Sequence, residues 1–65
     1  MESLHKTVKE LQRLKFSQLE ISAQAGVSQM TISRWANAEP RRVDTLALKK
    51  LTKFLEKVRH DKEGG

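Results

Sequence analysis

Between residues 28 and 37 the chain carries side chains suited to hydrogen bonding rather than to covalent chemistry. Gln29 offers an amide that donates and accepts together, and Arg34 offers a charged, planar fork of donors. No carboxylate occurs in this run. Residues of these types, without negative charge, favour recognition of a flat, polar and negatively charged partner.

The rest of the chain lacks the sets of residues that catalysis needs. There is no nucleophile placed with a general base, no pair of carboxylates for a cleft and no glycine-rich phosphate loop. His5 and His60 have no further ligand at metal-binding spacing, and both are interpreted as surface residues. The sequence therefore predicts no enzymatic activity, no cofactor, no metal and no small-molecule substrate.

Helical geometry gathers the hydrogen-bonding residues on one side. Ile32, Trp35 and Ala36 recur at the three-to-four spacing of an inward-facing stripe, so Trp35 is expected in the core rather than stacked on a partner. At about 100° per residue, the other side collects five side chains within an arc of about 140°. They are Gln29, Met30, Ser33, Arg34 and Asn37.

Two start signals and one glycine predict a second helix just before this one. Ser17 and Glu20 match a capping box for a helix over residues 17–25, and Ser28 can cap the helix that follows. Gly26 lies between them and can take the left-handed conformation of a tight turn. Two helices joined in this way form the helix-turn-helix unit, whose second helix enters the DNA major groove.

Amphipathic segments on either side of this pair predict two more helices, and no segment alternates like a strand, so the fold class is all-α. The first covers residues 2–14. The last begins at a capping Asp44 and runs to about His60, after a loop over residues 38–43; residues 61–65 are expected to fray. The apolar stripes are Leu4, Val8, Leu11 and Leu14 in the first helix, and Leu48, Leu51, Leu55 and Val58 in the last.

Composition agrees with a single small domain, placed at residues 1–60, with a thin core. Lys and Arg number 13 against 8 Asp and Glu, and the net charge of +5 favours a polyanionic partner over solubility alone. No apolar run is long enough for a membrane span, so no membrane association is expected. The absence of cysteine suits a cytoplasmic protein.

The helix-turn-helix residues follow a known order: Ser17, Gln18, Ile21, Ala25, Gly26, Val27, Ser28, Gln29, Thr31, Ile32, Ser33 and Arg34. This run resembles the lambda-repressor/Cro-like (Xre-type) helix-turn-helix family. Six later residues resemble its fourth helix: Asp44, Thr45, Leu46, Lys50, Leu51 and Leu55. The resemblance covers roughly residues 8–55. It implies a four-helix lambda-repressor-like domain that binds double-stranded DNA sequence-specifically.

The chain departs from the family pattern at three places. Ser22 stands where the family usually has alanine, and serine is still small enough for close helix approach. Ala38 stands where glycine usually follows the second helix, so we expect a different exit from that helix. Pro40 comes early in a loop that is about one residue longer than usual. These departures affect the loop more than the recognition helix.

The resemblance also implies roles for individual side chains. Gln29 would read a base, with adenine as its natural bidentate partner, and Arg34 would read guanine or hold a phosphate. Further base contacts would come from Ser28, Met30 and Ser33. Phosphate contacts would come from Gln18, Asn37, Arg41 and Arg42.

A small regulator of this kind resembles a phage Cro-type repressor, which acts by occupying an operator in a bacterial or phage-infected cell. One recognition helix reads few base pairs, so we expect a homodimer, at least on DNA, bound to a palindromic operator. Its contacts are expected in the loop over residues 38–43 and in the last helix, including Phe54 and Val58.

Two alternatives are kept open. One is a protein-interaction module, such as an antitoxin-like regulatory partner. An exposed apolar patch would favour it, and the candidates are Leu19, Met30 and Phe54. The other is the helix-turn-helix DNA-binding domain of a larger recombinase.

Overall fold

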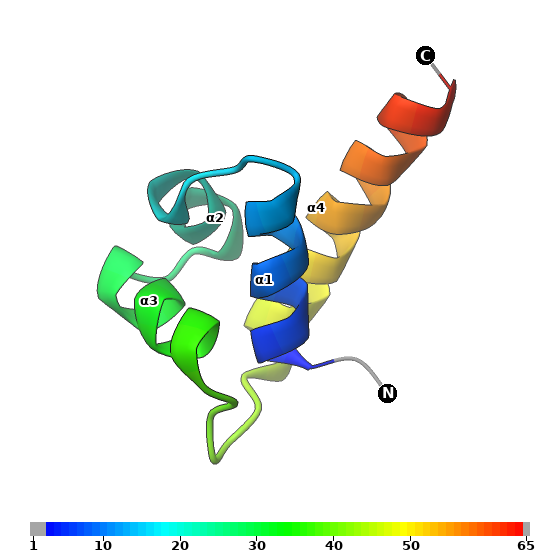
Figure 1. Ribbon diagram of the computed structural model, residues 1–65. Coiled ribbons are helices and arrows are strands. Elements are labelled where there is room, and N and C mark those ends of the chain that lie inside the picture. Colours follow the sequence, from blue (N-terminus) through cyan, green and yellow to red (C-terminus); the bar gives the residue numbers. More distant parts are fainter. Residues whose placement is uncertain (1–2, 65) are drawn as a thin grey trace.

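A computed structural model describes residues 3–64 of the chain, with side chains up to Asp61. Four helices follow one another: α1 (Leu4–Arg13), α2 (Gln18–Ala25), α3 (Gln29–Asn37) and α4 (Thr45–Gly64) (Figure 1). The predicted all-α class and helix order are confirmed, and the described residues contain no strand.

The helices pack around α1 and a small apolar core. α1 and α2 each contact both α3 and α4, whereas α3 and α4 lie apart on opposite sides of α1 (Figure 1). The end of α4 projects beyond the other helices. Burial of apolar surface between these layers is the main favourable term in folding. The core residues are Leu4, Val8, Leu11, Ile21, Ala25, Ile32, Trp35, Ala47 and Leu51.

The three predicted N-caps are confirmed, whereas within the described residues the Glu20 carboxylate makes no return bond to the Ser17 N–H, so the predicted capping box is only half formed. In each N-cap, a side-chain oxygen accepts a hydrogen bond from the backbone N–H three residues later, a group that the helix itself leaves unpaired. The pairs are Ser17 with Glu20 (3.1 Å), Ser28 with Thr31 (3.2 Å) and Asp44 with Ala47 (3.0 Å).

The turn between α2 and α3 has the predicted left-handed glycine. Gly26 has φ 70° and ψ 28°, and its N–H donates to the Ser22 carbonyl at 2.9 Å. The Val27 N–H donates to the same oxygen at 3.2 Å, and Val27 packs against the core. Ser22 is buried, as the close approach of the helices requires, and its hydroxyl donates to the Leu19 carbonyl at 2.7 Å.

The turn between α1 and α2 contains a second left-handed residue that the sequence analysis did not predict. Lys15 has φ 73°, and its N–H donates to the Gln12 carbonyl at 2.9 Å. The Phe16 N–H donates to the Leu11 carbonyl at 3.1 Å. This pair of bonds is the Schellman motif, which usually places glycine at the left-handed position.

Two helix boundaries differ from the prediction. α1 begins at Leu4 after a capping Ser3 and ends at Arg13; Leu14 is half-buried outside the core, and residue 2 lies outside the described residues. α4 runs on to Gly64, beyond the predicted end near His60, because no proline or glycine interrupts it earlier. Fraying of the last residues stays a prediction, and Gly65 lies outside the described residues.

The predicted stripes are buried only in part. Leu4, Val8 and Leu11 are fully buried in α1, whereas in α4 full burial is reached by Leu51 alone of the predicted stripe. Leu48, Leu55 and Val58 are half-buried. Trp35 is in the core, with 7% of its surface exposed, as predicted.

The interpretation of His5 as a surface residue is wrong. Its side chain is half-buried, and Nδ1 lies 2.8 Å from the Trp35 carbonyl oxygen. Its backbone N–H donates to Glu39 Oε2 at 3.3 Å. The first bond joins the start of α1 to α3 and the second joins it to the loop just after α3, so His5 helps to hold α3 in place. His60 is exposed, as predicted.

Candidate nucleic-acid interface

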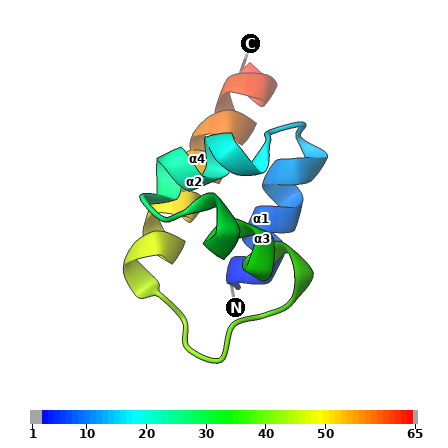
Figure 2. The ribbon, with the colours of Figure 1, turned by 90° about the vertical axis from the view of Figure 1, so that its left-hand side faces the viewer.

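One side of α3 packs against the core, and the opposite side is exposed to solvent. Ile32 and Trp35 lie on its inward side and are 0% and 7% exposed. Turning the molecule brings α3 to the front, with α2 above it and the long loop below (Figure 2). Gln29, Met30, Arg34 and Asn37 are exposed, so one side of α3 faces solvent along its length.

The predicted base-contact residues lie together along this helix. Met30 is 69% exposed, and the side of α3 away from the core also carries Gln29 and Arg34 as exposed residues. Ser28 is exposed at the N-cap, and Ser33 is half-buried. Within the described part of the chain, Gln29 and Arg34 form no side-chain hydrogen bond or ion pair, so their donors and acceptors are available to a partner.

Two of the predicted contact residues already use part of their hydrogen-bonding capacity. The Ser28 oxygen caps α3 and lies 2.9 Å from the Thr31 hydroxyl. The Asn37 amide donates to the Ser33 carbonyl at 3.0 Å, folding the side chain back along its own helix. Ser28 and Asn37 lie at the two ends of α3, and between them Gln29 and Arg34 keep all their side-chain donors and acceptors available.

Three of the four predicted phosphate-contact residues flank α3 on two other segments, and the fourth, Asn37, ends α3 itself. Gln18 is half-buried in the first turn of α2, directly after the Ser17 cap. Arg41 and Arg42 are exposed in the loop between α3 and α4. Ala38 leaves α3 with φ −158° and ψ 155°, an extended backbone that needs no glycine. Whether this exit differs from that of other family members stays a prediction.

The outward side of α3 carries no negative charge. No acidic residue occurs within α3, and the nearest one along the chain, Glu39, accepts a hydrogen bond from the His5 backbone. That bond directs the Glu39 carboxylate toward α1. With Arg34 on the helix and arginines in the loop after it, this surface is suited to a polyanion.

The exposed apolar residues differ in part from those expected. Leu19 and Met30 are 64% and 69% exposed, as expected. Phe54 is half-buried instead, because its ring packs edge-on against Phe16 with centroids 5.0 Å apart. Two further exposed apolar residues, Val43 at the end of the loop and Leu46 in the first turn of α4, were not predicted from the sequence. Val43 is an apolar residue outside the helical stripes, and this feature of the sequence could have indicated its exposure.

The sequence was compared with models of known protein families. A helix-turn-helix model matches residues 8–62, which include nearly all of the four helices. The chain belongs to the Xre-type, lambda-repressor-like helix-turn-helix family. Comparisons with curated proteins and with solved structures gave no match. The family consists of DNA-binding regulatory domains and is not typically enzymatic. Among the described residues, no helix is both long and apolar enough to cross a membrane.

Proposed function

We propose that this Xre-type domain is a sequence-specific regulator of the Cro type, which reads an operator in duplex DNA with α3. The observation that carries the proposal is the outward side of α3. It presents exposed, unpaired Gln29 and Arg34 without any carboxylate on the helix. Base edges in the major groove are read by bidentate amide and guanidinium groups of this kind.

In this proposal, one group of side chains reads bases and a second group contacts phosphates. Gln29 reads adenine and Arg34 reads guanine or holds a phosphate, while Ser28, Met30 and Ser33 line the groove. The second group fixes the register on the DNA backbone and carries no sequence information. It consists of Gln18, Asn37, Arg41 and Arg42.

Two copies are proposed to bind a palindromic operator. Each good base contact discriminates by about 1–3 kcal/mol, so one short helix supplies little specificity. A two-fold pair places its recognition helices about 34–36 Å apart in successive major grooves. The loop over residues 38–43 and the last helix are the proposed contact, since Val43 in the loop and Leu46 in the first turn of α4 leave apolar surface exposed. Occupation of the operator would itself exclude a competing protein, and this suffices for repression.

A selection from randomised duplex DNA tests the proposal. The selected consensus should be a palindrome with half-sites about 10 base pairs apart, and native mass measurement should find two chains on it. Gln29→Ala should weaken binding to that duplex by about 1–3 kcal/mol and relax one position of the half-site. Gln24→Ala is the matched control, because Gln24 is exposed on α2 and outside the proposed contact set.

Three outcomes would contradict all or part of the proposal. Binding without sequence preference at physiological salt would remove the regulator function. An unchanged consensus and affinity for Gln29→Ala would show that α3 is placed differently in the groove. A consensus without symmetry, bound by one chain, would rule out the two-fold pair but not sequence-specific binding by α3.

A further inference from the structure

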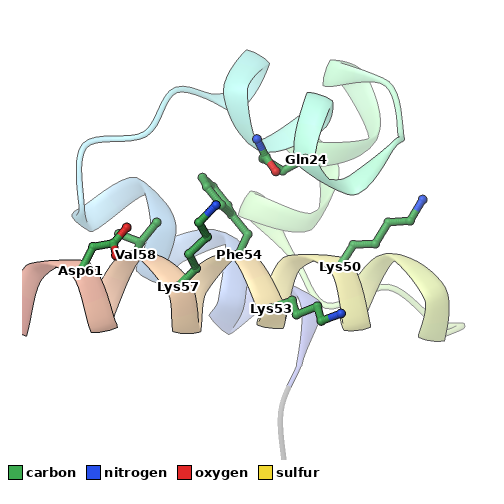
Figure 3. Close-up of a pocket in the computed structure, with 7 residues that line it drawn as sticks. All are labelled: Gln24, Lys50, Lys53, Phe54, Lys57, Val58 and Asp61. Atoms are coloured by element: carbon green, nitrogen blue, oxygen red, sulfur yellow. The ribbon is translucent and has the colours of Figure 1, made fainter. Parts of the chain in front are cut away.

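A groove between α2 and α4 lies apart from α3 and from every residue proposed to contact DNA. Its volume is about 710 Å³. In the close-up, Gln24 lies over the groove from α2, and the other lining residues come from α4, with Lys53 extending to the side away from α2 (Figure 3). The lining residues are Gln24, Lys50, Lys53, Phe54, Lys57, Val58 and Asp61.

The floor of this groove is apolar and its rim is cationic. Phe54 and Val58 are half-buried, so each presents part of an apolar side chain to the groove. Lys50, Lys53 and Lys57 recur at three-to-four spacing along the same helix. Lys57 rises beside the Phe54 ring toward α2 (Figure 3). Such a surface offers both apolar burial and ion pairing to one occupant.

The lysines of the rim are available for a partner. All three are exposed, and the ion pair found among the described residues joins Arg13 to Glu10 on α1 instead. Asp61, the one carboxylate that lines the groove, lies at the far end from Lys50. The positive charge of the rim is therefore not neutralised within the described part of the chain.

The shape of the groove favours a helix as its occupant. The lining residues of α4 run from Lys50 to Asp61, a length of about 16 Å at 1.5 Å per residue. The groove is open along this length (Figure 3). A small ligand needs about 70–90% of its surface covered, which an open trough does not provide. An amphipathic helix needs only one face covered.

Charge selects among the larger occupants. A second copy of this chain carries a net charge of +5 and the same row of lysines, so the two grooves would repel each other. DNA phosphates would pair with the lysines but would leave the Phe54 and Val58 surface unused. An acidic amphipathic helix uses both parts of the surface.

We propose that the groove between α2 and α4 binds an acidic amphipathic helix of a partner protein. Apolar residues of that helix lie on Phe54 and Val58, and its carboxylates pair with the lysines of the rim. Asp61 repels a carboxylate at its own end, so the partner helix carries a neutral or basic residue there.

A synthetic peptide of about 14 residues, long enough for nearly four helical turns, serves as the probe. It carries leucine at helical spacing on one face and glutamate on both flanks. Fluorescence anisotropy should detect micromolar binding to the full chain. Lys53→Glu with Lys57→Glu should weaken this binding at least tenfold. Lys6→Glu with Lys9→Glu is the matched control, since it makes the same charge change at exposed positions on α1.

Two further measurements separate the floor from the rim. Val58→Ser should weaken peptide binding while every lysine remains, and thermal melting shows whether each variant is folded. A peptide with serine in place of leucine should bind at least tenfold more weakly, because it cannot use the apolar floor. Neither test involves DNA, so failure here would leave the proposed function intact.

Several results would overturn the inference. No peptide binding at protein concentrations on the order of 100 μM would overturn the proposed helix-binding site. Equal losses from the α1 and α4 charge changes would show attraction by net charge alone. Equal binding of the serine peptide would show a site for any polyanion. Displacement of the peptide by random duplex DNA, with the α4 pair also weakening DNA binding, would make the groove a nucleic-acid surface. Displacement by dodecanoate at micromolar concentration would make it a small-ligand site.

Discussion

The chain turns twice through a left-handed residue, and two different amino acids take this conformation. Lys15 follows α1 with φ 73°, and Gly26 follows α2 with φ 70°. In both turns backbone N–H groups donate back to carbonyls of the helix just ended. The left-handed conformation costs an ordinary L-residue about 1–2 kcal/mol, and glycine takes it without this cost. The same geometry is strained in one turn and relaxed in the other.

The surroundings of the two residues explain how the strain is tolerated at Lys15. Lys15 is exposed, and the next residue, Phe16, packs edge-on against Phe54, which offsets the strain. A Cβ on Gly26 would instead lie 3.2 Å from Lys50 Nζ, so a side chain there would add crowding to strain. The Gly26 turn also sets the position of α3 relative to α2. Strain there would act on the candidate interface as well as on stability.

Gly26→Val tests the more demanding turn and should have the largest effect. A β-branched residue fits the left-handed conformation poorly, so the free energy of unfolding should fall by about 2–3 kcal/mol. In a domain of this size that lowers Tm by roughly 10–20 °C, measurable by circular dichroism. An unchanged Tm would show that the turn relaxes to another backbone conformation. In that case the Gly26 turn would be no more demanding than the Lys15 turn.

Gly26→Lys places the residue of the first turn into the second. Strain alone should lower the free energy of unfolding by about 1–2 kcal/mol. The Lys50 ammonium must also move by a few tenths of an ångström, which is cheap for the end of a flexible side chain. The loss should therefore be smaller than for Gly26→Val in denaturant titration. A loss equal to that of valine would mean that crowding, not backbone strain, dominates at this position.

Lys15→Gly is the reverse change and should have the smallest effect, with the opposite sign. Relief of strain exceeds the added chain entropy of glycine, so the free energy of unfolding should rise by about 0.5–1 kcal/mol. A loss of stability would show that Lys15 makes a favourable contact outweighing its backbone strain.

Much of the fold and the candidate interface could be predicted because the signals are local. A cap such as Ser28 and its Thr31 partner are three residues apart, and both are visible in the sequence. The burial of Ile32 and Trp35 follows from helical spacing, and it places Gln29 and Arg34 outward by the same rule. The outward side of α3 was therefore predicted correctly as a surface, while its contacts with DNA stay a proposal.

The sequence by itself determined the four helices, their caps and the glycine turn, because each depends on residues within one or two helical turns. Only the tertiary structure decided three other features: the left-handed Lys15, the bonds of His5 to Trp35 and Glu39, and the groove floored by Phe54. His5 and Trp35 are 30 residues apart, and no local pattern encodes their contact. Such contacts arise when whole helices pack, since packing brings distant residues together and supplies the energy that offsets local strain.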